Sequence, residues 1–566
     1  MADCYTSEGK FFADCWKTSP APHDSTYLCR CPKRLADLAC RNWPTQDRPA
    51  YSSNMVVVRR KTLSRLSSRI LVVVEFLFTL AILSPALYAV QNPHALHLIS
   101  VKNQATKKSQ AAEALPLIAP PGSVVHEARR GDSLPSVARQ YLKKTSFLTS
   151  SELGEAIRHA NGDRTGTFLH PGEQLIIPGI LDAPIVEKTV AVPKDFEVRA
   201  IYLTGVMAGS DHGLRIIHHW REVGGNAVVF DIKDSDGIVN IAFDHPLASG
   251  QKHYIHDLPK FTRFLHSQNM HAIARIAIFR DEHLVTTHPE LAVKSHRTGQ
   301  PWRENGKLVW TDPSNPKVQD YDIALAKFVA QSGVDEVQFD YVRFPAEGDQ
   351  KDATFTYQTD HPKWQRSEVI ADFLKRANAE IHPTGALFSL DVFGIMAWQR
   401  PVDLAHTGQD IVAMAKHCDV LSPMTYPSHF FGMDGVAHPG DAPEHFIGES
   451  MDRFKLITKD SGVVIRPWLQ AFAWRTKTYS PKYIEVQIEV AKEKGGIGFL
   501  FWNANNDYSK PYAAMPEMRA AKDKDKFFRG DELPNKTDVS VPAVPVVSTP
   551  TPTVQPVSSP VKIWRH

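Results

Sequence analysis

Apolar and polar positions between residues 197 and 525 repeat as a short strand followed by an amphipathic helix. The strands are rich in Val, Ile and Phe, and the stretches between them place apolar residues three and four positions apart, as helices do. The predicted strands are 198–205, 227–233, 271–280, 336–342, 386–393, 420–426, 464–471 and 496–503. Eight strand–helix units are typical of a (β/α)8 TIM barrel of the α/β class, expected here over 190–525. A doubly wound open sheet is the alternative, but no glycine-rich phosphate loop follows the first strand, so the barrel is favoured.

Glycines and capping residues mark the ends of two predicted helices. The stretch DHGLRIIHHWREVGG is predicted to be capped by Asp211 and to end at Gly224 and Gly225. A second helix is predicted over Asp322–Gln331, with Gly333 ending it.

Polar side chains fall on one face of several predicted strands. Successive side chains of a strand point to opposite faces, so one parity faces the barrel interior. Polar or charged residues take this inward parity on five of the eight strands, whereas the outward parity is apolar. Active residues of TIM barrels lie at the C-terminal ends of the strands, so the pattern predicts a pocket there. The residues predicted to bind the substrate are Asp231, Lys233, Arg275, Gln338, Arg343, Tyr426, Trp468, Gln470 and Trp502.

The fourth strand, EVQFDYVRFP at residues 336–345, carries the strongest candidate. Its polar face holds Gln338 and Asp340, and its apolar face holds Val337, Phe339 and Tyr341. An ionised carboxylate taken out of water needs a partner, a metal or a substrate, so Asp340 is a candidate site residue. The alternative is a structural ion pair between Asp340 and Arg343.

Asp340 and Asp391 end two neighbouring strands and form a candidate catalytic pair. Neighbouring strands lie about 4.8 Å apart, so the two carboxyl groups are predicted to approach to roughly 5–5.5 Å, as in a retaining glycosidase. One carboxylate would attack the anomeric carbon, and the other, kept protonated by the nearby like charge, would deliver a proton. Tryptophan rings would stack on sugars, with core packing as the alternative for each. For Asp231 the alternative is an ion pair with Lys233 or Arg275.

The histidines give no sign of a metal site. None of the 25 histidines falls in H-x-H or H-E-x-x-H spacing, so neither a metal nor a cofactor is expected. A metal-dependent hydrolase using Asp231, Asp234 and Asp340 is a weaker alternative, because no histidine ligand lies near them in the sequence. Asp234 and Asp236 are predicted to lie in a loop and turn.

Several segments of the barrel carry a resemblance to a known family. WTDPSNPKVQDYDIALAKFVAQSGVDEVQFDYVRFP, AIYLTGVMAGS and VVFDIKDSDG resemble the bacterial family labelled putative glycosyl hydrolase domain, a TIM barrel whose fourth strand reads FDYxRFP. This family is distantly similar to the α-amylase clan, in which the fourth-strand aspartate is the nucleophile, so the resemblance implies that role for Asp340. The clan's fifth-strand acid is a glutamate, whereas this chain has Asp391. The resemblance implies no particular substrate.

Residues 123–180 have a separate pattern, from VVHEARRGDSLPSVARQYL to LHPGEQLIIPG. The first contains a predicted turn and helix N-cap, and Pro171-Gly172 is a predicted turn into a second strand. Both stretches resemble the LysM module, a small α+β domain of βααβ order. The resemblance implies binding to peptidoglycan or another N-acetylglucosamine polymer, and it rests at the candidate glycan-binding positions on Gly131, Asp132, Ser133, Leu134 and Asn161.

The N-terminal region has the composition of a targeting segment. A basic run after Met55 precedes the apolar segment 70–90, so 55–90 is typical of a secretory signal. An uncleaved membrane anchor is the alternative, and either one places the rest of the chain outside the cytoplasm. Residues 1–54 are interpreted as a gene-model extension.

Three further segments have no predicted fold. A cytoplasmic metal-binding role for 1–54 through Cys29, Cys31 and Cys40 is the alternative to a gene-model extension. Residues 91–122 are predicted to be a linker. Residues 526–566, rich in Pro, Thr, Ser and Val, are predicted to be an unfolded tail.

These patterns together give two functional hypotheses. A net charge of only +3 over 566 residues argues against a nucleic-acid partner. The leading hypothesis is an exported glycoside hydrolase of the cell envelope, periplasmic or wall-associated. It would cleave a polysaccharide with Asp340 and Asp391 and be held at peptidoglycan by the LysM-like module. The alternative is a catalytically inactive barrel that serves as a glycan-binding or scaffold protein.

Overall fold

The computed structural model describes residues 117–163 and 166–529. The predicted extension 1–54, the signal or anchor 55–90, and most of the linker and tail lie outside these described residues. Export and membrane attachment therefore stay predictions. Within the described ranges, no helix is both long enough and apolar enough to cross a membrane.

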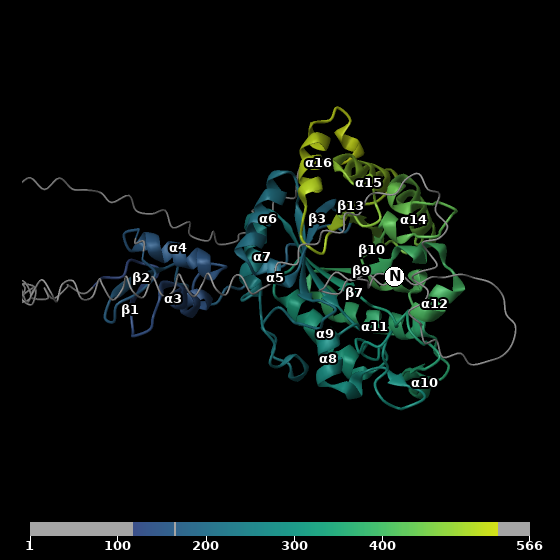
Figure 1. Cartoon of the computed structure of the whole chain (residues 1–566), viewed down its shortest axis with the longest axis horizontal. Helices are drawn as coiled ribbons and strands as arrows, with labels where there is room; N and C mark the ends of the chain where they lie inside the picture. The colour runs from purple at the N-terminus through teal and green to yellow at the C-terminus, as the bar shows by residue number, and fades with distance from the viewer. Residues whose placement is uncertain (1–116, 164–165, 530–566) are drawn as a thin grey trace, which may run out of the picture. The chain divides into compact units, whose positions relative to one another are not determined.

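Parallel strands close into the predicted barrel, with helices around it (Figure 1). The strands pair in the order β3-β4-β5-β7-β9-β10-β12-β13, and β13 returns to β3. The seventh strand is split into two short pieces because Pro467 has no N–H to donate to a neighbouring strand. The strands are β3 (Val198–Leu203), β4 (Ala227–Lys233), β5 (His271–Ala277), β7 (Glu336–Asp340), β9 (Leu387–Phe393), β10 (Val420–Met424), β11 (Val464–Ile465), β12 (Trp468–Gln470) and β13 (Gly498–Trp502).

Helices follow the strands, and two of them differ from the prediction at their first residues. Ser210, not Asp211, caps α6, because its side chain accepts from the N–H of Gly213. The helix predicted from Asp322 begins at Pro316 after an Asn315 cap. The helices are α5 (Gly205–Ala208), α6 (Asp211–Glu222), α7 (Leu258–Ser267), α8 (Glu282–Thr287), α9 (Pro316–Gln331), α10 (Tyr357–Asp360), α11 (Arg366–Ile381), α12 (Pro401–Thr407), α13 (Ile411–Met414), α14 (Pro443–Ile457), α15 (Pro481–Glu493) and α16 (Ser509–Ala520).

Alternation of side chains along the strands produces two apolar layers. Outward residues such as Val228, Phe230 and Leu390 pack against the helices in the larger core. Inward residues fill the barrel in a smaller core that includes Tyr202 and Trp468. The inward layer becomes polar toward the C-terminal ends of the strands, where the candidate site residues lie.

Residues 123–178 fold in the βααβ order that the sequence predicts. The elements are β1 (Ser123–Glu127), α3 (Leu134–Tyr141), α4 (Ser150–Ala160) and β2 (Gln174–Pro178). The two strands pair antiparallel over their full length, and Leu134, Val137 and Ile157 lie in a small core of their own. We refer to this part as the N-terminal module.

The five residues predicted to bind a glycan also make contacts that stabilise this module. Leu134 is 2% exposed, and the Ser133 side chain caps α3. Asn161 donates to the carbonyl groups of Ile157 and Ile176, which ties the end of α4 to β2. Asp132 accepts from the N–H of Arg129 in the turn, and Gly131 supplies a φ of +95° there. These contacts give the five residues a role in building the module, and their contact with a glycan stays a prediction.

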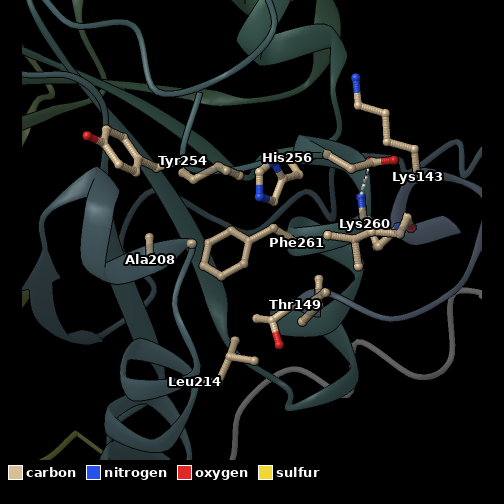
Figure 2. A pocket seen from close by; sticks show the side chains of 13 residues that line it. Lys143, Thr149, Ala208, Leu214, Tyr254, His256, Lys260 and Phe261 are labelled. Atoms are coloured by element: carbon tan, nitrogen blue, oxygen red, sulfur yellow. Dashed lines mark hydrogen bonds between the residues drawn. The ribbon is translucent and has the colours of Figure 1, made fainter. Parts of the chain in front are cut away.

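A barrel lysine joins the module to the barrel. Lys260 on α7 donates from Nζ to the carbonyl oxygens of Leu142, at 3.0 Å, and Phe147, at 3.2 Å. Thr149 of the module also donates to Asp211 of the barrel. Figure 2 shows Lys260, Phe261 and Thr149 lining a small cavity at this junction. The cavity is made by residues of both parts and contains none of the predicted site residues.

Candidate active site

Arg275 on β5 brings together carboxyl groups from three other strands. Its Nη1 lies 2.5 Å from Asp231 Oδ1 on β4, and its Nη2 lies 2.6 Å from Asp340 Oδ2 on β7. Its Nε lies 3.7 Å from Asp391 Oδ2 on β9. Asp234, predicted to be only a loop residue, also lies 3.4 Å from Nη1. One guanidinium therefore faces four carboxyl groups, which we call the Arg275 cluster.

Burial and neighbouring charges raise the pKa of two carboxyl groups in this cluster. Burial raises the pKa of Asp231 to about 7, against the opposing charge of Arg275. Burial and the charge of Asp340 raise the pKa of Asp391 well above its usual range. The raised pKa favours the protonated form of Asp391, which is the form that can donate a proton.

Asp391 is held so that one oxygen remains for that proton. Its side chain is 1% exposed, and Trp468 Nε1 donates to Oδ1 at 2.6 Å. Oδ2 accepts no hydrogen bond from the described residues. The pairing of Phe339 with Leu390 places Asp340 and Asp391 next to each other on β7 and β9, as the sequence predicts.

Asp340 is the last residue of β7, and the backbone turns sharply after it. Tyr341 has a φ of +53°, and its N–H donates to Asp340 Oδ1 at 2.6 Å. The prediction that Tyr341 continues the apolar face of the strand is therefore wrong. A left-handed conformation costs a bulky residue about 1–2 kcal/mol, and such conformations cluster at functional sites. Here the turn aims an N–H at the carboxyl group.

Tyr202 is a site residue that the sequence reasoning missed. Its hydroxyl donates to Asp231, and its ring stacks on Trp502 with centroids 6.2 Å apart. The guanidinium of Arg275 lies 5.6 Å from the centre of the Tyr202 ring. Strand parity was the available signal, since Val198, Ala200 and Tyr202 share the inward face of β3.

Lys233 was predicted to face the barrel interior with Asp231 and bind the substrate, and that prediction is wrong. The pairing of β4 with β5 shifts register between Asp231 and Lys233, which reverses the alternation. Lys233 Nζ lies 2.7 Å from Asp322 Oδ1 on α9 and 3.0 Å from Asp281 Oδ2. This fully buried lysine therefore forms structural ion pairs with Asp281 and Asp322.

Three of the predicted substrate contacts are fully buried and make contacts within the barrel. Gln338, Trp468 and Gln470 are each at most 1% exposed. Gln338 lies 3.4 Å from Ser422 Oγ. Trp468 positions Asp391 instead of offering its ring to a sugar. Gln470 donates to Phe472 O and Thr476 Oγ1, both at 2.9 Å, so it positions the loop after β12.

Arg343 is held by aromatic rings and a carbonyl group. Its Cζ lies 4.4 Å from the centre of the Phe393 ring and 4.7 Å from that of Trp310, and Nη1 donates to Phe344 O at 3.1 Å. Asp340 forms its short ion pair with Arg275. Arg275 is likewise the partner of Asp231, as one of the sequence alternatives has it.

Aromatic rings form a wall beside the carboxyl groups. Tyr426 and Trp502 have ring centroids 6.0 Å apart, and Phe472 lies 5.6 Å and 5.5 Å from them. Burial and the charges of Asp391 and Asp340 raise the pKa of Tyr426 well above its usual range. Trp502 is half-buried, so part of this wall faces outward. Such a surface suits the apolar face of a sugar ring.

The same cluster does not have the form of a metal site. In residues 117–163 and 166–529, no three His, Cys, Asp or Glu side chains are arranged to hold a metal ion. Arg275 lies between Asp231 and Asp340, where a bridging cation would have to lie. The donor set is thus already built around an organic cation.

Several solved structures are similar to this chain. A hypothetical protein from Ruminiclostridium thermocellum is 35% identical, covers 34% of this chain and 97% of its own, and has a TM-score of 0.31. The PgaB (BpsB) glycoside hydrolase domain from Bordetella bronchiseptica is 14% identical, covers 56% and 99%, and has a TM-score of 0.42. A chitinase from Chromobacterium violaceum is 11% identical, covers 58% and 100%, and has a TM-score of 0.36. No curated protein matches the chain.

The family comparison covers more than half of the chain. The sequence profile described as "Putative glycosyl hydrolase domain" matches residues 200–508. This range begins within β3 and ends just before α16, so it includes most of β3, all the other strands of the barrel and the whole Arg275 cluster. The chain belongs to the putative glycosyl hydrolase domain family.

Proposed function

We propose that this chain is a glycoside hydrolase of the cell envelope that cleaves a polysaccharide with Asp340 and Asp391. The observation that carries the proposal is the Arg275 cluster, because it places Asp340, which accepts two hydrogen bonds, beside Asp391, whose pKa is raised. Glycoside hydrolysis uses two neighbouring carboxyl groups, one to attack the anomeric carbon and one to supply a proton.

Each residue of the pair has one task in the proposed reaction. An oxygen of Asp340 attacks the anomeric carbon, the bond from that carbon to the glycosidic oxygen breaks, and the Asp391 proton moves to the leaving oxygen. Water then attacks the same carbon, Asp391 takes a proton from it, and the bond to Asp340 breaks. The products are two shorter glycans with one water added.

The neighbours of the pair serve to position it. Arg275 and the N–H of Tyr341 each donate to one oxygen of Asp340 and so fix its orientation. Trp468 fixes Asp391 through Oδ1. The aromatic wall of Tyr426 and Trp502 supports the sugar ring. Asp231 binds the other terminal nitrogen of Arg275 and accepts from the Tyr202 hydroxyl.

The proposal also includes attachment and location. The LysM resemblance supports binding of the N-terminal module to peptidoglycan, and the basic and apolar composition of 55–90 supports export. Phe168 in the module is 84% exposed and pairs by its backbone with Ser133 beside the predicted turn. We therefore expect Phe168→Ala to weaken co-sedimentation of the full chain with peptidoglycan. Leu456→Ala, which removes a side chain 69% exposed on α14, is the matched control.

The catalytic proposal is tested with Asp340→Asn. The change keeps the shape of the side chain and removes its charge, so turnover on a glycan panel should fall by about three orders of magnitude or more. A fully active, folded Asp340→Asn protein would rule out the mechanism.

The same panel distinguishes the second candidate, a glycan-binding barrel without catalysis. That candidate draws on Asp391, which is shorter than the glutamate of the related clan and 1% exposed. Glycan binding by the wild-type chain, with no turnover of any polymer in the panel, would favour it.

A further inference from the structure

A path of aromatic rings leads from the Arg275 cluster to an exposed arginine. His429 lies 5.9 Å from Phe472 of the aromatic wall and 5.0 Å from Trp474, measured between ring centroids. At the end of the path, Arg475 Cζ lies 4.4 Å from the centre of the Trp474 ring and 4.9 Å from that of Phe431. Phe431 is 62% exposed, and Arg475 is exposed as well.

The loop that carries Arg475 is held in a strained shape. Arg475 has a φ of +50°, a conformation that costs a residue with a side chain about 1–2 kcal/mol. Gln470 donates to Thr476 Oγ1 from below, and Thr476 Oγ1 donates to the carbonyl of Trp474 at 3.0 Å. Gly440 makes room for the turn, since a Cβ there would lie 2.2 Å from the carbonyl oxygen of Arg475.

Gln470, Thr476 and Gly440 thus hold the backbone in the shape that presents the Arg475 side chain. Gln470 also accepts from the N–H of Ser428 at 3.2 Å, so it fixes the loop of Phe431 together with that of Arg475. The Arg475 side chain is exposed, so side-chain packing does not offset the cost of its left-handed backbone conformation. Residues held in such conformations cluster at ligand clamps.

The chemistry of Arg475 indicates what it binds. Rings that lie against the guanidinium leave its N–H edge to act as a donor, and a planar guanidinium pairs with a carboxylate through two parallel hydrogen bonds. In the described part of the chain, no Asp or Glu forms an ion pair with Arg475. Its charge is therefore left for a ligand.

We propose that Arg475, Trp474 and Phe431 form an outer subsite that selects a polysaccharide bearing carboxylate groups. This inference rests on the proposed function, because it names the substrate class of the same site. Two sugar types supply that chemistry: one with an ether-linked lactyl group, as in peptidoglycan strands, and one with the carboxylate on the ring, as in polyuronates.

The test is a binding measurement with matched acidic and neutral probes. The full chain carrying Asp340→Asn, which removes turnover, is titrated with peptide-free peptidoglycan oligosaccharides and with chitooligosaccharides of equal length. A second arm uses oligogalacturonates and their carboxyl-reduced counterparts. We expect affinity for at least one acidic probe to exceed its neutral counterpart by about tenfold to a hundredfold, and the arm that responds identifies the sugar type.

Substitution of Arg475 assigns that preference to the subsite. Arg475→Gln should reduce the ratio of the two affinities to about one, and Arg475→Lys, which keeps the charge without the planar fork, should restore part of it. Arg215→Gln on the outer face of α6 removes one exposed charge and should change nothing. Equal binding of both probe types, no binding of either acidic probe, or a preference that survives Arg475→Gln overturns the inference. A preference that disappears in Arg475→Gln while the wild-type chain hydrolyses no acidic glycan leaves the subsite standing and defeats the hydrolase proposal instead.

Discussion

At the scale of single residues, the protonation of Asp391 decides how the proposed reaction runs. Burial and the charge of Asp340 raise its pKa well above the usual range, which favours the protonated acid. Asp391→Asn removes the acid, so turnover of natural glycans should fall by about a hundredfold or more. Synthetic glycosides with good leaving groups need no proton and should lose much less. Steady-state rates on both substrate types check this, and an equal loss on both would contradict the role of Asp391 as acid.

The raised pKa of Asp231 predicts how the stability of the folded protein depends on pH. Its pKa in the folded protein is raised to about 7, whereas the pKa of an aspartate in an unfolded chain is about 3.9. Between these values the folded protein holds a proton that the unfolded chain has released, so the free energy of unfolding falls as pH rises from about 4 to about 7. Asp231→Asn cannot ionise, so its melting temperature should fall less than that of the wild type between pH 5 and pH 7.5. Parallel slopes for the two proteins would contradict the raised pKa.

Residue types and parity predicted part of this site, and local backbone geometry determined the rest. The inward parity of Asp231, Asp340 and Asp391 could be read from alternation alone. The register shift beside Lys233 could not, because a bulge depends on how two strands pair in space. The ion pairs of Arg275 could not be predicted either, because its partners lie on strands far apart in the sequence.

At the scale of elements, the seam between β13 and β3 closes the barrel and depends on one glycine. Gly498 has a φ of +76°, and a Cβ there would lie 1.9 Å from the carbonyl oxygen of Val198. Gly498→Ala should therefore lower the free energy of unfolding by about 3 kcal/mol or more. Gly385 has a φ of +87° with nothing within 4 Å of its Cβ position, so Gly385→Ala should cost only about 1–2 kcal/mol. Urea unfolding of both variants measures the difference, and equal losses would show that the seam tolerates a side chain.

Element types were easier to predict than element ends. All eight barrel strands were predicted from apolar runs, because every parallel strand is buried on both faces. The predicted end of β7 lies too far along the chain, because tyrosine is common in strands but Tyr341 has a left-handed backbone. Ser210 was missed as a cap because Asp211, directly after it, is an equally good capping residue.

At the scale of the whole molecule, Lys260 couples the N-terminal module to the barrel. Lys260→Met keeps the length of the side chain but removes both hydrogen bonds to the module, at a cost of about 1–3 kcal/mol. Leu142 O still accepts from Thr145, so the loss falls mainly on the Phe147 carbonyl. We expect calorimetry to show one unfolding transition for the wild type and a separate, earlier one for the module in the variant. Lys327→Met, which removes a lysine from a half-exposed ion pair on α9, should keep the single transition. Two transitions already present in the wild type would contradict the coupling.

The crowding of carboxyl groups around Arg275 has a consequence for inhibitors. A cationic iminosugar, which imitates the charge of an oxocarbenium ion, would enter a cluster in which Asp231 titrates near pH 7. The incoming charge favours the ionised form of Asp231, so binding would expel a proton to the solvent. Affinity for such a compound should therefore strengthen as pH rises from 6 to 8, provided that the iminosugar itself stays protonated. The heat of binding should also change with the ionisation enthalpy of the buffer, which makes the protonation state of this cluster visible without any knowledge of the natural substrate.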